Sequence, residues 1–394
     1  MEDFLFGLPS LTPCPGLLTT RQQLLIAHET HRSLIFQIPK TSQGQKTLNR
    51  LGPNRTVGLS AMLKIGYGAE HEQYQPLPLL DYAVEAEKSG FDSVWTSDHF
   101  HPWAHTNAAG GFSWVWMAAL AERTKRVEIG TGVMCPTLRY HPAIVAQAFA
   151  TLRNMYPGRI FVGLGTGEAM NEVPLGYTWP PFKERAERLE EAIKVMKLLW
   201  SRSFVNFKGK YYRLRKANLY TKPSSPPPIY VAASGPTVAE IAGRYADGFL
   251  TIGIAEKQYR SVLLPAMEKG AKSAGRDSDK IIKAMEVLVS YDEDFDKALA
   301  AVRFWAGALM PVMFMSGIYD PRVVEEHGHL VGDKQLAEHW LIGTKPEDHI
   351  RRLEKYIKMG FEHIYVVSSS PDEIKTLKMY AKDVLPYIRS TYRK

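Results

Sequence analysis

Residues 62–97, MLKIGYGAEHEQYQPLPLLDYAVEAEKSGFDSVWTS, contain in order a strand, a helix and a second strand. The runs MLKIGYG and DSVWTS have the short apolar character of buried strands. Between them, apolar residues recur at helical spacing until Gly90, which is a common helix stop. A strand followed by a helix and another strand is the repeating unit of a parallel α/β sheet.

The same unit repeats to the end of the chain. Six further strands are predicted, and a helical pattern follows each of them. Their ranges are 126–134, 159–167, 227–234, 247–253, 281–292 and 363–370. Eight strands, each followed by a helix, predict an α/β fold: a single closed (β/α)8 TIM barrel over residues 62–394 rather than an open doubly wound sheet.

Three segments lie outside the eight strand–helix units of the predicted barrel. Residues 204–220 have the pattern of a hairpin, and residues 307–333 form a second insertion after a barrel strand. Such insertions commonly become lids or pocket walls. Residues 1–61 lack the strand and helix pattern, so we expect a disordered extension outside the barrel domain, with a transit peptide as the alternative.

The composition is that of a soluble globular protein. Apolar residues make up 45% of the chain without a run of membrane-spanning length, so no membrane association is expected. The two cysteines, Cys14 and Cys135, are too few for a disulfide framework and lack zinc-ligand spacing, which favours the reducing cytoplasm. The net charge of +8 is scattered over the helices, which argues against a nucleic-acid partner.

Four loops stand at the predicted functional end of the barrel. Chemistry in (β/α)8 barrels collects at the C-terminal ends of the strands. The loops that follow strands two to five there are SDHFHPW (97–103), GVMCPTLRYHP (132–142), GTGEAMNE (165–172) and ASGP (233–236). We therefore expect these loops to face one pocket.

The first of these loops begins a segment with three histidines. His99, His101 and His105 do not have the converging spacing of a zinc site, and no second cluster completes one, so no metal is expected. Imidazole titrates near neutral pH, which suits His99, beside the strand end, for proton transfer. Trp103 would supply a flat apolar wall. His101 and His105 are expected to bond loop carbonyls.

Two glycine-containing turns suggest ligand contacts. VGLGTGE is not a dinucleotide fingerprint, because Glu168 stands where the third glycine belongs. Its glycines would instead allow close backbone approach and carry the Glu168 carboxylate into the pocket. Ser234 and Gly235 precede Pro236 at the start of a helix, which fits either a phosphate seat or ordinary capping by Ser234.

These motifs resemble a known family. The stretches SDHFHPW, PTLRYHPAIVAQAFAT, YPGRIFVGLGTGEAMNE, WPPFKER, ASGP and RFWA are similar to the coenzyme-F420-dependent branch of the luciferase-like oxidoreductases. Within that branch, the glucose-6-phosphate dehydrogenases and the secondary alcohol dehydrogenase are the most similar. The resemblance implies a (β/α)8 barrel, a homodimer and a deazaflavin cofactor.

The resemblance also implies cofactor contacts. They fall on Asp98, Cys135, Thr166, Gly167, Asn171, Ser234, Gly235 and Thr237. A non-prolyl cis peptide in strand three of the relatives would here join Gly132 and Val133 and lie behind the deazaflavin ring. Cys135 stands where the glucose-6-phosphate enzymes have threonine.

The catalytic roles that the family implies fit the chemistry of alcohol oxidation. The hydroxyl proton needs a base while the carbon gives up a hydride, and the reduced ring needs an acid. We assign His99 as base and Glu168 as acid, with the opposite order also arguable, and Trp103 as a stabiliser of the reacting complex. Glu72 matches a cleft glutamate of the family.

The match departs from the family at the sugar-phosphate site. The glucose-6-phosphate enzymes hold the phosphate with two lysines and an arginine, and the aligned positions here are Ala255, Met315 and His339. Lys257 and Arg260 lie near the first of them and are possible substitutes. Phosphate requires paired cationic donors, so a neutral or partly apolar alcohol is favoured over a sugar phosphate.

Three alternatives remain at this stage. The fold also fits an FMN-dependent luciferase-like monooxygenase, and the resemblance also fits an F420-dependent reductase of a pterin or other unsaturated substrate. A deazaflavin-binding carrier or sensor would fit the barrel but leave His99 and Glu168 without a role.

Overall fold

The computed structural model describes residues 63–253 and 255–393. The expectation of a disordered extension over residues 1–61 therefore lies outside the described residues. The same holds for the predicted start of the first strand at Met62.

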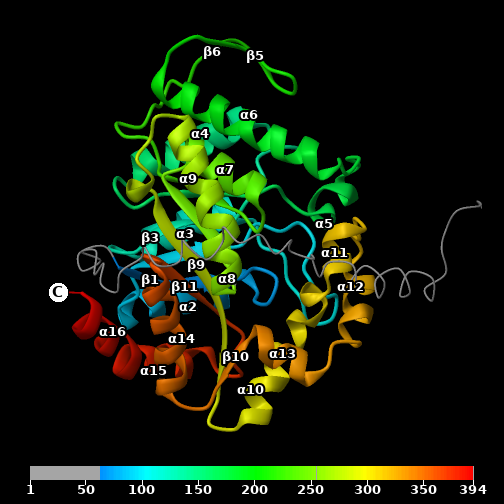
Figure 1. Cartoon of the computed structure of the whole chain (residues 1–394), viewed down its shortest axis with the longest axis vertical. Coiled ribbons are helices and arrows are strands. Elements are labelled where there is room, and N and C mark those ends of the chain that lie inside the picture. Colours follow the sequence, from blue (N-terminus) through cyan, green and yellow to red (C-terminus); the bar gives the residue numbers. More distant parts are fainter. Residues whose placement is uncertain (1–62, 254, 394) are drawn as a thin grey trace, which may run out of the picture. The chain divides into compact units, whose positions relative to one another are not determined.

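Eight parallel strands form the barrel (Figure 1). Their order is β3-β2-β1-β11-β9-β8-β7-β4. Their bounds are β1 Lys64–Ala69, β2 Ser93–Thr96, β3 Glu128–Thr131, β4 Val162–Leu164, β7 Ile229–Ala232, β8 Gly248–Ile252, β9 Ile282–Tyr291 and β11 His363–Ser368. Isolated parallel bridges pair Ile129 with Ile160 and Met134 with Leu164, which brings the first and last strands of this order together. The predicted (β/α)8 barrel is confirmed.

The helices follow the strands as the sequence predicts. The main ones are α2 Pro76–Ser89, α3 Ser113–Arg123, α4 Pro142–Met155, α6 Phe182–Ser201, α7 Pro236–Tyr245, α9 Leu264–Ser273, α14 Pro346–Met359, α15 Glu373–Met379 and α16 Leu385–Tyr392. Proline at the first turn starts several of them. Gly90 ends α2 in the left-handed conformation, with a φ of 98° that glycine adopts at no steric cost.

Both predicted insertions are present. Strands β5 (Val205–Lys208) and β6 (Arg213–Ala217) form the antiparallel hairpin beyond α6 (Figure 1). The second insertion follows α10 (Phe295–Ala301) and a 3-10 segment. It contains α11 Pro311–Met315, α12 Pro321–Gly328 and the start of α13 Asp333–His339. Strand β10 (Leu341–Gly343), which pairs with β9, was not predicted, because three residues carry too little pattern.

Aromatic side chains fill the interior of the barrel. Trp95 stacks on Tyr365 with ring centroids 4.6 Å apart, and Phe161 and Tyr230 pack against the same indole. His363 completes this layer, and its burial lowers its pKa to about 3, so the ring is neutral. These packed rings close the barrel interior below the C-terminal ends of the strands.

Candidate active site

A cavity of about 470 Å³ lies at these strand ends. Each of the four loops that the sequence singled out contributes to its lining, through residues such as His99, Cys135, Glu168 and Ser234. The segment after β1, strands β8, β9 and β11, and the second insertion complete the wall. The volume falls within the range of small-molecule sites in proteins.

His99 sits in this cavity with its ring held on both sides. Its Nε2 lies 3.4 Å from Oε1 of Glu72, whose other oxygen accepts a 2.5 Å hydrogen bond from Ser97. Its Nδ1 lies 3.3 Å from the carbonyl oxygen of His101. A carboxylate beside an imidazole orients the ring and stabilises its protonated form. Glu72 was expected in the substrate cleft; its pairing with His99 was not anticipated.

Asn171 joins the two residues that the sequence assigns to proton transfer. This residue of α5 (Ala169–Glu172) donates from Nδ2 to Oε2 of Glu168 at 3.1 Å, and the same nitrogen lies 3.4 Å from Nδ1 of His99. Its Oδ1 accepts a 2.8 Å bond from the backbone N–H of Phe100. The imidazole and the carboxylate therefore share one cavity, as the proposed chemistry requires.

Asp98 lines the cavity, but protein donors already occupy its carboxylate. Arg139 and Ser113 donate to it at 2.5 and 2.7 Å, and Tyr140 lies at 3.3 Å. Arg139 also faces Glu172, whose pKa burial raises to about 7 despite that guanidinium. This buried network fixes the loop that carries His99.

Backbone forms a flat wall on another side of the cavity. The peptide between Gly132 and Val133 is cis, as the resemblance implied. A Cβ on Gly165 would lie 2.8 Å from Cγ2 of Val133, and one on Gly167 would lie 2.6 Å from Sγ of Cys135. Only glycine fits at these two positions, so the wall stays smooth enough for a planar ligand.

Two other expected cofactor residues, Cys135 and Thr166, belong to this side of the cavity. The Cys135 thiol lies 3.0 Å from the Thr137 hydroxyl. Burial raises its pKa to about 12, so it remains a neutral thiol at physiological pH.

The start of α7 differs from the expectation in one respect. Ser234 lines the cavity, but its side chain caps no helix, and Gly235 occupies the N-cap position. The capping interpretation of Ser234 is therefore wrong, because the helix begins one residue later than that role requires. Gly235 and Thr237 flank this point without lining the cavity, and Thr237 is exposed.

The positions aligned with the sugar-phosphate site do not converge on the cavity. Ala255 is exposed at the start of the short helix α8 (Glu256–Gln258). His339 is also exposed, and its Nδ1 lies 2.9 Å from the Gln335 carbonyl of its own helix. Met315 belongs to α11, and its side chain lies outside the described residues.

Aromatic residues from the second insertion and its surroundings form a wall that was not predicted. Phe314 packs on Trp103 with centroids 5.3 Å apart, and Trp103 lies 5.5 Å from the His99 ring. Trp305 and Trp340 lie 6.2 Å apart on the same cavity. The insertion thus serves as a pocket wall, in line with the expectation for residues 307–333.

Two acidic residues on the barrel side of the cavity were also missed. Glu70 is the first residue after β1, and Glu286 lies within β9. The hydroxyl of Tyr365 donates a hydrogen bond to Glu286. Burial raises the pKa of Glu70 well above its ordinary value and that of Glu286 to about 7, and repulsion from Glu72 adds to both.

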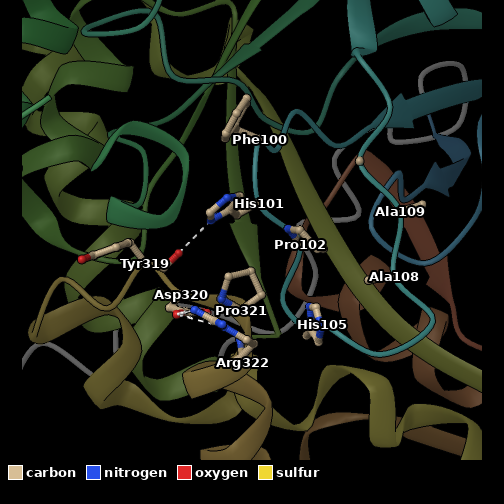
Figure 2. Close-up of a pocket in the computed structure, with 11 residues that line it drawn as sticks. Phe100, His101, Pro102, His105, Ala108, Ala109, Tyr319, Asp320, Pro321 and Arg322 are labelled. Atoms are coloured by element: carbon tan, nitrogen blue, oxygen red, sulfur yellow. Dashed lines mark hydrogen bonds and ion pairs between the residues drawn. The ribbon is translucent and has the colours of Figure 1, made fainter. Parts of the chain in front are cut away.

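A second hollow, of about 620 Å³, lies between the loop after β2 and the second insertion (Figure 2). Figure 2 shows His101 pointing toward Tyr319, and the two are joined by a 2.9 Å contact from Nδ1 to the carbonyl oxygen. Glu325 accepts from the backbone N–H groups of His105 and Thr106, each at 2.9 Å. The expected bond of the His101 side chain to a loop carbonyl is confirmed, whereas His105 is bonded here through its backbone N–H. These bonds tie the loop after β2 to the insertion.

Neither a metal cluster nor a membrane span is found within the described part of the chain. No group of three or more His, Cys, Asp or Glu side chains there is arranged to hold a metal ion. None of the helices described is both long and apolar enough to cross a bilayer.

Comparison with known proteins identifies a family match and similar enzymes. The family described as luciferase-like monooxygenase matches residues 57–363. The F420-dependent glucose-6-phosphate dehydrogenase of Intrasporangium calvum is 44% identical over 83% of this chain and 99% of its own length. The enzyme of the same name from Mycolicibacterium smegmatis is 42% identical over 84% and 99%.

Similar solved structures include F420-dependent enzymes. An F420-dependent secondary alcohol dehydrogenase in complex with an F420-acetone adduct is 45% identical, with a TM-score of 0.80 over 82% of this chain and 98% of that one. The coenzyme-F420-dependent tetrahydromethanopterin reductase of Methanopyrus kandleri is 25% identical, with a TM-score of 0.66 over 83% and 99%.

Proposed function

The chain belongs to the luciferase-like monooxygenase family, and from this premise we propose that it is an F420-dependent dehydrogenase that oxidises an alcohol carbon. The observation that carries the proposal is the arrangement of His99 and Glu168, which Asn171 joins within one cavity beside a flat backbone wall. The names of relatives at 42–45% identity support the same activity.

The residues present fit a deazaflavin. The glycine-lined wall at Gly132, Gly165 and Gly167 suits one face of a planar ring. Ser234 lies just before the N-terminus of α7, where backbone N–H groups favour an anionic tail of the cofactor. When bound, F420 would supply the two-electron acceptor that takes the hydride from the alcohol carbon. FMN is the alternative cofactor.

His99 serves as the base in this proposal. Nδ1–H donation to the His101 carbonyl leaves the Nε2 lone pair for the proton of the substrate hydroxyl. Glu72, 3.4 Å from Nε2, then stabilises the imidazolium. Glu168, on the other side of Asn171, holds the proton that neutralises charge developing on the bound ring.

We propose a neutral alcohol as the substrate, in preference to a sugar phosphate. Among the described residues that line the cavity there is no lysine or arginine. A phosphate ester needs such groups, because it binds through paired cationic hydrogen bonds.

We further propose a cytoplasmic homodimer whose catalytic unit is residues 62–394. Leu77, Phe112, Val115 and Ile144 are exposed apolar residues at the start of α2, α3 and α4. The Trp116 indole donates to the Pro76 carbonyl at 3.1 Å, which places the start of α2, with Leu77, beside α3, with Val115. A second copy of the chain would cover these exposed residues. Sedimentation of the wild type as a dimer, and of Val115→Lys as a monomer, is the expected result.

Absorbance spectroscopy tests the activity. The protein is mixed with oxidised F420 and a panel of alcohols, and loss of the deazaflavin absorbance is followed. Turnover with F420 and none with FMN is the expected result. Turnover that requires FMN and oxygen would instead assign the chain to the monooxygenases of its family.

A further inference from the structure

Glu70 and Glu286 occupy the cavity without a part in the proton transfer just described. Glu286 accepts a bond from Tyr365, whose ring stacks on Trp95 in the barrel interior. Glu70 is only 8% exposed, and the Ser97 hydroxyl close to it donates its proton to Glu72 instead. The pair therefore forms a polar floor on the barrel side of the cavity.

Glu70 differs from the other acidic residues of the cavity, because the hydroxyl beside it, that of Ser97, is bonded to Glu72, while the neighbouring Glu286 has the neutral Tyr365 hydroxyl as its donor. Asp98 has Arg139, Glu72 has Ser97 and His99, and Glu168 has Asn171. Nearly complete burial without a counter-charge disfavours ionised carboxylates. The Glu70 carboxyl is thus a buried polar group that faces the cavity with hydrogen-bonding capacity unused.

We infer that Glu70 and Glu286 select a neutral substrate with several hydroxyl groups, an unphosphorylated sugar or polyol, by binding hydroxyls remote from the carbon that is oxidised. The inference rests on the proposed function and names its substrate class. It concerns recognition only and adds no chemical step.

Hydroxyl groups match this floor chemically. A protonated carboxyl offers one O–H donor and acceptor oxygens, and a hydroxyl likewise both donates and accepts. The raised pKa values of Glu70 and Glu286 keep such protons available near neutral pH. A phosphate ester would find no cationic donor among the described lining residues, and a simple alcohol would leave the two carboxyls unpaired, which costs binding energy.

The aromatic wall completes the match. Trp305 and Trp340 present flat apolar surfaces on the same cavity, and the indole N–H of Trp305 donates to Gln73 at 3.2 Å. A sugar or extended polyol has both C–H faces for such rings and hydroxyl edges for the carboxyls. A mostly apolar lining with a few placed polar groups is typical of specific small-molecule sites.

Steady-state kinetics with F420 test the inference on four substrate classes: neutral sugars and polyols, glucose 6-phosphate, 2-propanol, and an amino alcohol that carries an ammonium group. The wild type is expected to show a kcat/KM for the best neutral polyol at least tenfold above the other three. Glu70→Leu is expected to lower that value about tenfold or more, because each lost hydrogen bond costs about 1.5 kcal/mol, while 2-propanol changes less than twofold.

Matched variants separate recognition from folding. Glu70→Gln keeps a neutral donor and acceptor and should retain most of the polyol activity. Glu373→Gln alters another buried carboxyl, one with a pKa of about 7 that does not line the cavity, and should leave the preference unchanged. Thermal melts and F420 binding by fluorescence verify that each variant is folded.

Each outcome decides between the two proposals. A preference for 2-propanol over every polyol overturns the inference and leaves the proposed function standing. A preference for glucose 6-phosphate or the amino alcohol overturns the inference and the proposal of a neutral substrate, and leaves only the F420-dependent dehydrogenase activity. An equal loss for polyol and 2-propanol in Glu70→Leu also overturns the inference. Tight F420 binding without turnover of any alcohol overturns both.

Discussion

The catalytic corner and the floor of the same cavity are built in opposite ways. In the corner, His99, Asn171 and Glu168 are joined through contacts of 3.1 to 3.4 Å, and Glu72 backs the imidazole. In the floor, Glu70 faces the cavity without such a partner. Groups that move protons gain from fixed geometry, whereas groups that recognise substrate need unused hydrogen-bonding capacity.

The largest effect is expected from removing the base of the corner. His99→Ala should lower kcat by about 10²- to 10⁴-fold, the usual contribution of general base catalysis, because the variant lacks the imidazole proposed to accept the proton. Stopped-flow absorbance of F420 measures this rate. Cofactor affinity should change little, and near-full turnover with F420 bound would remove His99 from the mechanism.

A smaller effect is expected from replacing a floor carboxyl, Glu286, and it concerns the free energy of unfolding rather than the reaction rate. Burial raises the pKa of Glu286 from 4.5 to about 7, so between these pH values the folded chain keeps a proton that the unfolded chain releases. The wild type therefore loses stability as pH rises through this window, and Glu286→Gln loses less because the contribution of Glu286 is absent. Relative to the wild type, the variant should gain roughly 2–3 kcal/mol between pH 4.5 and pH 8.

Denaturant unfolding at several pH values measures that difference. Glu172 and Glu373 titrate in both proteins and cancel in the comparison, so the difference between the two curves measures Glu286 together with its repulsion of Glu70. A gap that stays constant with pH would mean that Glu286 is ionised in the folded cavity and that the floor is charged.

The smallest effect is expected from the residue that links the corner. Asn171→Ala removes the hydrogen bond to Glu168 and the 3.4 Å contact with the His99 ring while leaving both groups in place, so kcat should fall about tenfold. The KM for the alcohol should move less than twofold, because Asn171 positions these groups without binding substrate. A rise in KM at constant kcat would assign Asn171 to substrate binding instead.

Periodicity was enough to predict the barrel, because each strand and helix buries a face that repeats in the sequence. The rule that chemistry collects at strand ends was enough to predict the four loops of the cavity. The cis peptide at Gly132–Val133 and the place of Asn171 in the cavity came only from the resemblance, and the bond of Asn171 to Glu168 came only from the structure, since none of these leaves a periodic pattern.

The floor was missed for two different reasons. Glu70 directly follows a predicted strand, so the rule applied to the other loops would have found it. Glu286 interrupts the apolar run of β9, and a lone acid in a buried strand is a usable indication of a cavity. The wall formed by Phe314, Trp305 and Trp340 depends on tertiary contacts of an insertion, which no local pattern encodes.

Hydrogen transfer from a labelled alcohol tests the central claim most directly. A neutral polyol deuterated at the carbon that is oxidised is mixed with the wild type and oxidised F420 for a single turnover, and the reduced cofactor is analysed by mass spectrometry. The account predicts one deuterium on the reduced deazaflavin and a slower reaction than with the unlabelled polyol. Reduced cofactor without deuterium, formed at an unchanged rate, would contradict hydride transfer in this cavity.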